Sequence, residues 1–165
     1  MSFFDDYHEL QKQETIKISY YVINYCQNKN IFITNLKLLK LLYFINIHHL
    51  ICTHGKPIFK EEFLAWRHGP VLNSVYNYFK YGITTLTQNK IDQIKKDLGK
   101  EKITIIEETL DKYAQIDAWK LVEKTHINNG PWQTVFKNNK TNDNMCFDSI
   151  KHSEIYKFYK DIKDV

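Results

Sequence analysis

The stretch from residue 34 to 55, TNLKLLKLLYFINIHHLICTHG, constrains the fold more than any other part of the chain. Its apolar residues lie around most of a helix circumference, and only a narrow polar stripe of Lys37, Lys40 and His48 interrupts them. Thr34 is suited to cap the beginning of such a helix, and Gly55 is suited to end it. A helix this apolar needs cover on nearly every side. We therefore expect residues 35–53 to run through the centre of the domain.

Helical spacing of apolar residues continues on both sides of this central segment. It predicts a first amphipathic helix over residues 12–28. Further helices are predicted over residues 103–113, 117–126 and 152–162, with a short helix after Pro131 and a loop over 138–146. Residues 83–102 are polar and rich in lysine, and they form either a solvated helix with one apolar row (Ile91, Ile94 and Leu98) or a mobile excursion.

A length of 165 residues suits one domain with a single core. We expect a mainly α protein, with residues 12–165 as a compact multi-helix domain and residues 1–11 as an N-terminal extension. A small β element near residues 57–67 is the exception, because Phe59, Phe63 and Ala65 fall at even spacings that suit an extended strand.

Two short motifs combine aromatic, histidine and Gly-Pro residues. The first motif is AWRHGPV, residues 65–71, in which Gly69 permits a turn and Pro70 is favoured at the first position of a helix. It predicts a corner between a strand and a helix that ends near Gly82.

The second motif is THINNGPW, residues 125–132, which predicts a corner between two helices. We expect Trp66, His68, His126 and Trp132 to lie in or beside one shared core, with His68 as a hydrogen-bonded structural residue.

The charge of the chain is nearly balanced. Lys and Arg total 23 against 19 Asp and Glu, and both signs are spread along the whole length. A nucleic-acid-binding protein usually gathers its basic residues on one face or arm, and it favours arginine for bidentate contacts. Arg67 is the only arginine of the chain. We therefore do not expect nucleic acid as a partner.

The cysteines and the N-terminus indicate an ordinary cytoplasmic protein. Cys26, Cys52 and Cys146 have no CxxC spacing, so we interpret them as buried free thiols. The N-terminal MSFFDDYHEL is acidic where a signal peptide is basic. No apolar run is long enough for a membrane span, so we expect no membrane association.

Histidine is the first candidate for chemistry, because His48, His49 and His54 lie close together in the sequence. Adjacent residues on a helix point about 100° apart, so His48 and His49 cannot face one metal ion. His49 is instead predicted to pack inside the domain and make one hydrogen bond. Cys52 and His54 point to different sides at the end of a helix, and no nucleophile elbow, phosphate loop or dinucleotide motif is present. We expect no catalytic residues, no metal and no cofactor.

Aromatic residues are abundant, with 11 Tyr, 10 Phe and 3 Trp. Most are predicted to fill the core. Tyr76, Tyr78 and Tyr81 surround the segment after the first motif, and exposed tyrosines are frequent anchors in protein interfaces. They are our candidates for contact with a protein partner.

Several of these features together resemble a known family. KLLYF at residues 40–44, Gly55, EEF at 61–63, the first motif and VY at 75–76 resemble the opening half of the Panacea domain, the SocA-like antitoxin family of bacteria and phages. The second motif resembles that family's second signature, and the likeness runs from about residue 16 to residue 162. The signature residues, expected to shape the fold or the partner surface, are Lys40, Tyr43, Trp66, His68, Gly69, Pro70, Tyr76, His126, Pro131 and Trp132.

The resemblance implies an antitoxin that is not an enzyme and that binds and neutralises a cognate toxin, often the product of an adjacent gene. In the SocA branch it further implies an adaptor that delivers the toxin to an ATP-dependent protease. Three alternatives stay open: a nucleic-acid-binding transcriptional regulator, a phage accessory protein, and a hydrolase or metal enzyme that uses His68 or His126.

Overall fold

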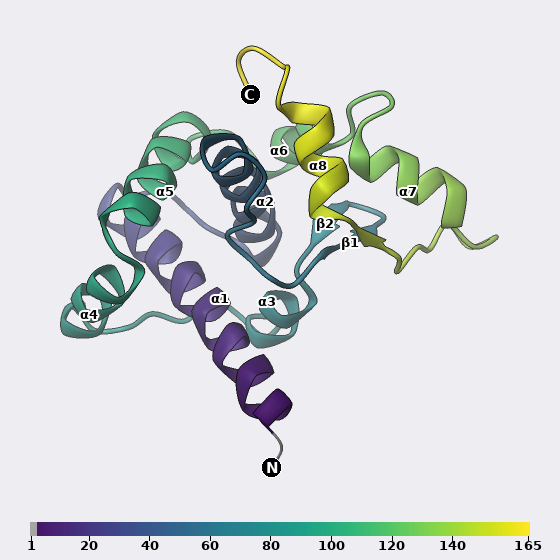
Figure 1. The fold of residues 1–165 in the computed structure, drawn as a ribbon. Coiled ribbons are helices and arrows are strands. Elements are labelled where there is room, and N and C mark those ends of the chain that lie inside the picture. The colour runs from purple at the N-terminus through teal and green to yellow at the C-terminus, as the bar shows by residue number, and fades with distance from the viewer. Residues whose placement is uncertain (1–2) are drawn as a thin grey trace.

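The computed structural model describes the backbone of residues 3–165 and the side chains of residues 13–165. Its helices are α1 (Phe3–Asn28), α2 (Asn35–Cys52), α3 (Asn73–Tyr78), α4 (Gln88–Leu98), α5 (Lys100–Tyr113), α6 (Ala118–Thr125), α7 (Pro131–Asn139) and α8 (His152–Tyr159). Its strands are β1 (Phe63–Trp66), β2 (Gly69–Val71) and β3 (Ser149–Ile150). The fold is therefore mainly α with a small short-stranded element, as predicted (Figure 1).

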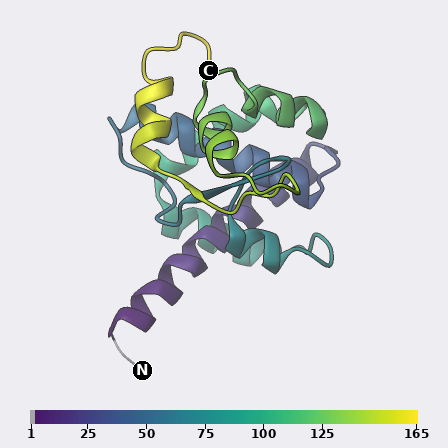
Figure 2. The ribbon, with the colours of Figure 1, turned by 90° about the vertical axis from the view of Figure 1, so that its right-hand side faces the viewer.

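Helix α2 occupies the centre of the molecule, which confirms the main prediction from the sequence. It packs against α1, α3, α5, α6, α8 and β2 (Figures 1 and 2). Thr34 caps it, because its hydroxyl accepts a hydrogen bond from the Lys37 amide at 3.2 Å. The expected polar stripe does not face water, since Lys37 is 7% exposed and Lys40 is 0% exposed. The neighbouring elements cover α2 on all sides, including the side that carries the lysines.

Helix α1 begins at Phe3, earlier than the predicted residue 12, and its first turns extend away from the rest of the molecule (Figures 1 and 2). Residues 1–2 of the expected N-terminal extension lie outside the described residues, as do the side chains of residues 3–12.

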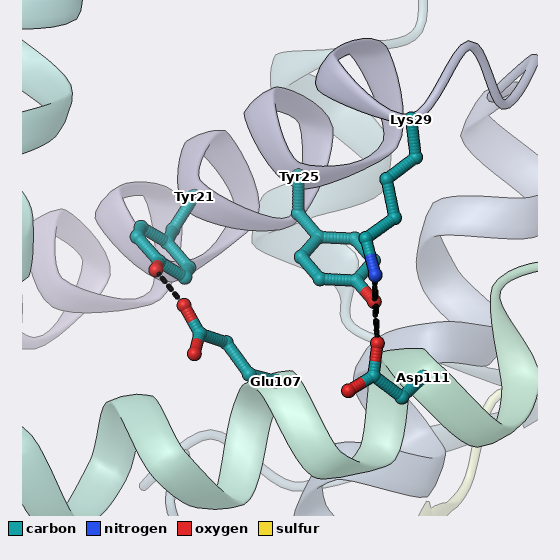
Figure 3. Close-up of polar contacts among 5 residues, drawn as sticks. All are labelled: Tyr21, Tyr25, Lys29, Glu107 and Asp111. Atoms are coloured by element: carbon teal, nitrogen blue, oxygen red, sulfur yellow. Dashed lines mark hydrogen bonds and ion pairs between the residues drawn. The ribbon is translucent and has the colours of Figure 1, made fainter.

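Polar contacts join α1 to α5 (Figure 3). Tyr21 donates a hydrogen bond to Glu107 at 2.5 Å, and Tyr25 donates one to Asp111. Lys29 pairs with Asp111 at 2.8 Å. These contacts fix the rotation of α1 relative to α5.

Residues 83–102 contain a helix, so the first of the two alternatives for this segment is correct. The predicted apolar row of Ile91, Ile94 and Leu98 is buried on one face of α4. Lys17 of α1 also pairs with Asp97 of α4, although both side chains are partly exposed. The segment is a packed helix, and Gly99 separates it from α5.

The first motif forms a β-hairpin, and the prediction of a strand-to-helix corner is wrong. Strand β1 pairs antiparallel with β2, with Ala65 opposite Pro70 and Trp66 opposite Gly69. An edge strand tolerates a proline because one of its sides needs no ladder hydrogen bond. Helix α3 begins only at Asn73. Strand β3, which the sequence did not reveal, pairs with the other edge of β1, so the strand order is β2-β1-β3.

The C-terminal helices α6 and α8 lie within the predicted segments, whereas α7 extends two residues into the predicted loop over 138–146. A buried polar network links α8 to α2. The Asn46 amide group donates to Nδ1 of His152 at 3.2 Å, and its oxygen accepts from the Ile58 amide. His152 Nε2 therefore carries the proton and donates to the Glu61 carbonyl at 3.1 Å. The network satisfies a fully buried asparagine at the centre of the fold.

Cys26 and Cys146 are buried free thiols as expected, whereas Cys52 is exposed at the end of α2. The expectation for His49 is confirmed, because the ring is 7% exposed and its Nδ1 lies 2.7 Å from the Lys56 carbonyl oxygen. None of the described helices is both long enough and apolar enough to cross a bilayer.

Candidate partner-binding site

The structure brings the two sequence motifs together beside α2. The indole Nε1 of Trp132 donates a hydrogen bond to the backbone carbonyl of Trp66 at 2.8 Å. The His126 ring stacks on Trp132, with ring centroids 3.6 Å apart and ring planes 4° from parallel. Trp132 is 6% exposed, and Phe136 stacks next to it. Three of the four residues expected near a shared core are therefore joined there.

His68 differs from the expectation. It lies in the hairpin turn, where its side chain is exposed, and its ring contacts Trp119 edge-on with centroids 5.2 Å apart. A residue in a two-residue turn projects away from the sheet, which explains why His68 is not part of the core. His68 and Trp119 together form an exposed aromatic pair.

Lys40 lies in the interior of the site. Its side chain is fully buried, and its ammonium group donates a hydrogen bond to the Pro70 carbonyl at 2.6 Å. Burial lowers the pKa of Lys40 to about 7, because the charged form loses its hydration. No carboxylate of the described side chains pairs with it. A buried lysine without an acidic partner is uncommon in proteins.

Gly69 makes this arrangement possible. Its φ of +98° lies in the left-handed region that favours glycine. A Cβ atom at this position would lie 2.7 Å from the Thr125 hydroxyl and 3.1 Å from the Lys40 ammonium nitrogen. The hairpin, the end of α6 and Lys40 therefore approach one another as closely as a residue without a side chain allows.

The other histidine of the motifs is held neutral. Burial is the main cause that lowers the pKa of His126 to about 4, and the nearby charges of Lys40 and His68 add to it. The Nε2 atom of His126 is buried, and it has no hydrogen-bond partner among the described residues. The stack on Trp132 thus holds an uncharged imidazole at neutral pH.

A cavity of about 320 Å³ opens beside these residues. We call it the signature cavity, because four of the signature residues line it. Its lining consists of Asn35, Leu36, Leu39, Lys40, Trp66, Arg67, His68, Val71, Tyr76 and Met145. The lining contains no acidic residue. Leucine, valine, methionine and aromatic side chains form most of the wall, and Asn35 with the basic residues Lys40, Arg67 and His68 forms the rest.

Exposed aromatic and apolar side chains surround the signature cavity. Tyr76 and Met145 belong to its wall and are 37% and 41% exposed. Phe147 is 57% exposed and contacts Trp66 edge-on, while Trp119 is 54% exposed and contacts His68. These four side chains form a rim that water covers in the isolated chain. Exposed aromatics around a pocket are typical of protein-binding surfaces.

The three candidate tyrosines do not share one place. Tyr76 lies at the signature cavity and contacts Trp66 edge-on, with ring centroids 4.7 Å apart. Tyr78 is directed toward α1, where its hydroxyl accepts a hydrogen bond from Tyr20. Tyr81 is 93% exposed in the segment after α3. Among the other signature residues, Tyr43 is fully buried against Phe63, and Pro131 begins α7.

A larger cavity of about 930 Å³ lies between α1, α3 and α4. Three of its charged groups already have partners within the chain, since Lys17 pairs with Asp97 and Glu61 accepts hydrogen bonds from Ser74. Among the described side chains, no three His, Cys, Asp or Glu residues gather as a metal site requires.

A comparison with known protein families identifies the family of this chain. Residues 38–133 match the model of the family described as Antitoxin SocA-like, Panacea domain, and this match covers more than half of the chain. The protein belongs to this family. The matched range contains the central lysine, the hairpin and the stacked His126 and Trp132, so both motifs fall within it.

A curated relative agrees with this assignment. Over 122 residues the chain is 33% identical to Antitoxin SocA of Caulobacter vibrioides, strain NA1000 / CB15N. The alignment covers 67% of this chain and 63% of the relative's length. No solved structure shows a significant match to the chain.

The sequence pointed to Lys40, Trp66, His68 and Tyr76, but not to Asn35, Leu36, Leu39, Met145, Phe147 and Trp119 as residues of the site. Met145 lies in a polar segment that suggested only a loop. One feature of the sequence indicates that Lys40 is buried: it occurs in the most apolar segment of the chain.

Proposed function

We propose that this protein is an antitoxin that neutralises a cognate protein toxin by binding it directly, rather than by catalysis. The observation that carries the proposal is the rim of Tyr76, Met145, Phe147 and Trp119 around the signature cavity. Family membership supports an antitoxin role. The rim supplies apolar and aromatic surface of the kind that anchors a protein partner.

Two further parts of the proposal concern its setting. The toxin is the product of an adjacent gene, and both proteins meet in the cytoplasm. The bound toxin is then delivered to an ATP-dependent protease, as the resemblance to the SocA branch suggests. This delivery needs a second surface, so that the toxin and the protease can be bound at once.

The test is co-expression of this chain with the product of each adjacent gene in a host where that product arrests growth. We expect growth to be restored by the wild-type chain and lost again with Phe147→Ser and Trp119→Ser together. Ile162→Ser is the matched control, because Ile162 is 40% exposed in the C-terminal segment after α8. An adjacent product that is harmless alone, or whose toxicity the chain does not relieve, overturns the proposal.

Protease delivery is tested separately by the lifetime of the toxin. We expect the toxin to disappear faster when the antitoxin is present, and this acceleration to vanish in a host that lacks the ATP-dependent protease. If growth is restored while the toxin remains stable, the protein blocks its target without delivering it.

A further inference from the structure

The interior of the signature cavity has an unbalanced charge. Lys40 is fully buried, and the Pro70 carbonyl is its one hydrogen-bond acceptor among the described residues, although an ammonium group has three donors. A buried cation is costly unless an anion or several acceptors compensate it. The cavity wall offers no Asp or Glu for this purpose. Among the described residues nothing else compensates the charge, so a bound partner or loss of the proton must do so.

Further polar atoms at the cavity also lack partners. The indole Nε1 of Trp66 is buried, and no described residue accepts a hydrogen bond from it. Arg67 and His68 add donors at the hairpin turn, and both are exposed. Three basic side chains and Trp66, whose indole N–H is unpartnered, therefore line one acid-free cavity. This combination is complementary to a carboxylate.

The remaining wall selects for an apolar group. Leu36, Leu39, Val71 and Met145 line the cavity beside these donors. Its volume of about 320 Å³ is at the small end of the range for binding pockets, which is roughly 300–1000 Å³. A site of this size accepts one large side chain together with a neighbouring carboxylate.

We infer that the signature cavity receives a segment of the toxin that presents an apolar side chain beside a carboxylate, with Lys40 and Arg67 as the carboxylate's basic partners. This inference rests on the proposed function and names the chemistry of its contact. The rim aromatics bind the surface around the inserted segment. The buried lysine gives specificity, because a segment without a carboxylate leaves its charge uncompensated.

The chemistry can be tested without knowing the toxin. The probes are N-acetyl-leucine, which carries a carboxylate, and N-acetyl-leucine amide, which has the same side chain without the charge. Binding is followed through the indole N–H signal of Trp66 in a nitrogen-15 correlation spectrum of the full chain, and Trp66→Phe assigns that signal. We expect the acid to shift the signal and to bind at least about tenfold more tightly than the amide, which corresponds to about 1.4 kcal/mol.

A matched pair of variants locates the charge. Lys40→Met is expected to remove the preference for the acid, whereas Lys37→Met is expected to keep it. Lys37 is a buried lysine of the same helix, and it is not part of the cavity wall. If Lys40→Met does not fold, Arg67→Ala takes its place, because Arg67 is exposed in the turn. The Arg67→Ala substitution is expected to weaken binding of the acid. Equal binding of acid and amide, or no binding of either, overturns the inference.

The same variants separate this inference from the proposed function. If the wild-type chain and Lys40→Met restore growth equally in co-expression, the protein is an antitoxin but the cavity does not select a carboxylate. If the wild-type chain relieves no toxicity while the acid still binds through Lys40, the proposed function fails and the chemistry of the cavity stands.

Discussion

His126 stacks face to face on Trp132, with ring centroids 3.6 Å apart, although a five-residue segment separates the two in the chain. The loop between them closes where the Gly130 amide donates to the Ile127 carbonyl at 2.9 Å. Trp132 then reaches the hairpin through its bond to the Trp66 carbonyl. One aromatic pair thereby connects the second motif to the first. The two motifs are distant in sequence, and they form one structural unit at α2.

The indole of Trp132 is expected to stabilise this unit by packing and by its hydrogen bond. Trp132→Ala removes both, and it should lower the free energy of unfolding by about 3–5 kcal/mol. Trp132→Phe keeps much of the ring contact and loses the bond to Trp66, so a loss of about 1 kcal/mol is expected from the bond itself. Urea denaturation of both variants measures the two values. Equal losses of unfolding free energy in Trp132→Phe and Trp132→Ala would show that packing contributes little.

Gly69 is expected to tolerate no side chain. Gly69→Ala places a methyl group against the Thr125 hydroxyl and the Lys40 amine, and it also forces alanine into the left-handed region. Gly82→Ala is the matched control, because Gly82 also has a positive φ but has open space around it. The melting temperature should fall further for Gly69→Ala than for Gly82→Ala. Similar decreases would mean that backbone strain alone matters and that the close approach does not.

Lys40 is expected to make stability depend on pH. The unfolded chain keeps the Lys40 proton up to its ordinary pKa of 10.5, whereas the native state releases it near pH 7. Unfolding therefore takes up a proton between these values, and the contribution of Lys40 stabilises the native state as the pH rises. From about pH 7 to about pH 9 the gain should be about 2 kcal/mol.

Burial also raises the pKa of the Cys26 thiol to about 11, and this opposes the rise of stability with pH. Because Cys26 is present in both proteins, the comparison of wild type with Lys40→Met isolates the contribution of Lys40. Denaturation at several pH values measures the difference between wild type and variant. A difference that does not change with pH would contradict a buried lysine of lowered pKa.

The contacts between α1 and α5 are expected to differ in strength (Figure 3). Tyr21 is buried, and its phenol has a raised pKa. Burial is the larger cause, and the hydrogen bond to Glu107 is the second. Tyr21→Phe should cost about 1 kcal/mol of unfolding free energy. Tyr25→Phe removes a bond at the exposed Lys29 and Asp111 pair and should cost less, because water screens that pair. A larger loss for Tyr25→Phe would contradict this order.

Much of the fold was predictable because its main signals are local. The apolar run of α2 and the row of Ile91, Ile94 and Leu98 on α4 need no knowledge of distant residues. The position of Pro70 shows where local reasoning fails. Proline is favoured at a helix start, yet here pairing with β1 decides, and strand pairing depends on a partner that local propensity does not reveal.

The site was predictable only in part, both in its residues and in their arrangement. The motifs suggested that Trp66, His68, His126 and Trp132 meet, and all but the exposed His68 do. The polar stripe containing Lys40 did not reveal which elements cover it, because helix periodicity describes one helix and not its neighbours. Met145 reaches the cavity from a loop distant in sequence, and no spacing rule connects it with α2.

The most direct test of direct toxin binding at the signature cavity is the dissociation constant of the purified chain for the adjacent-gene product, measured by calorimetry. We expect a saturable complex that Phe147→Ser and Trp119→Ser together weaken by at least about tenfold, equivalent to about 1.4 kcal/mol. Ile162→Ser should bind as the wild type does. A complex whose affinity is unchanged by the two rim substitutions, or the absence of any complex with a product that the chain neutralises, would contradict the account.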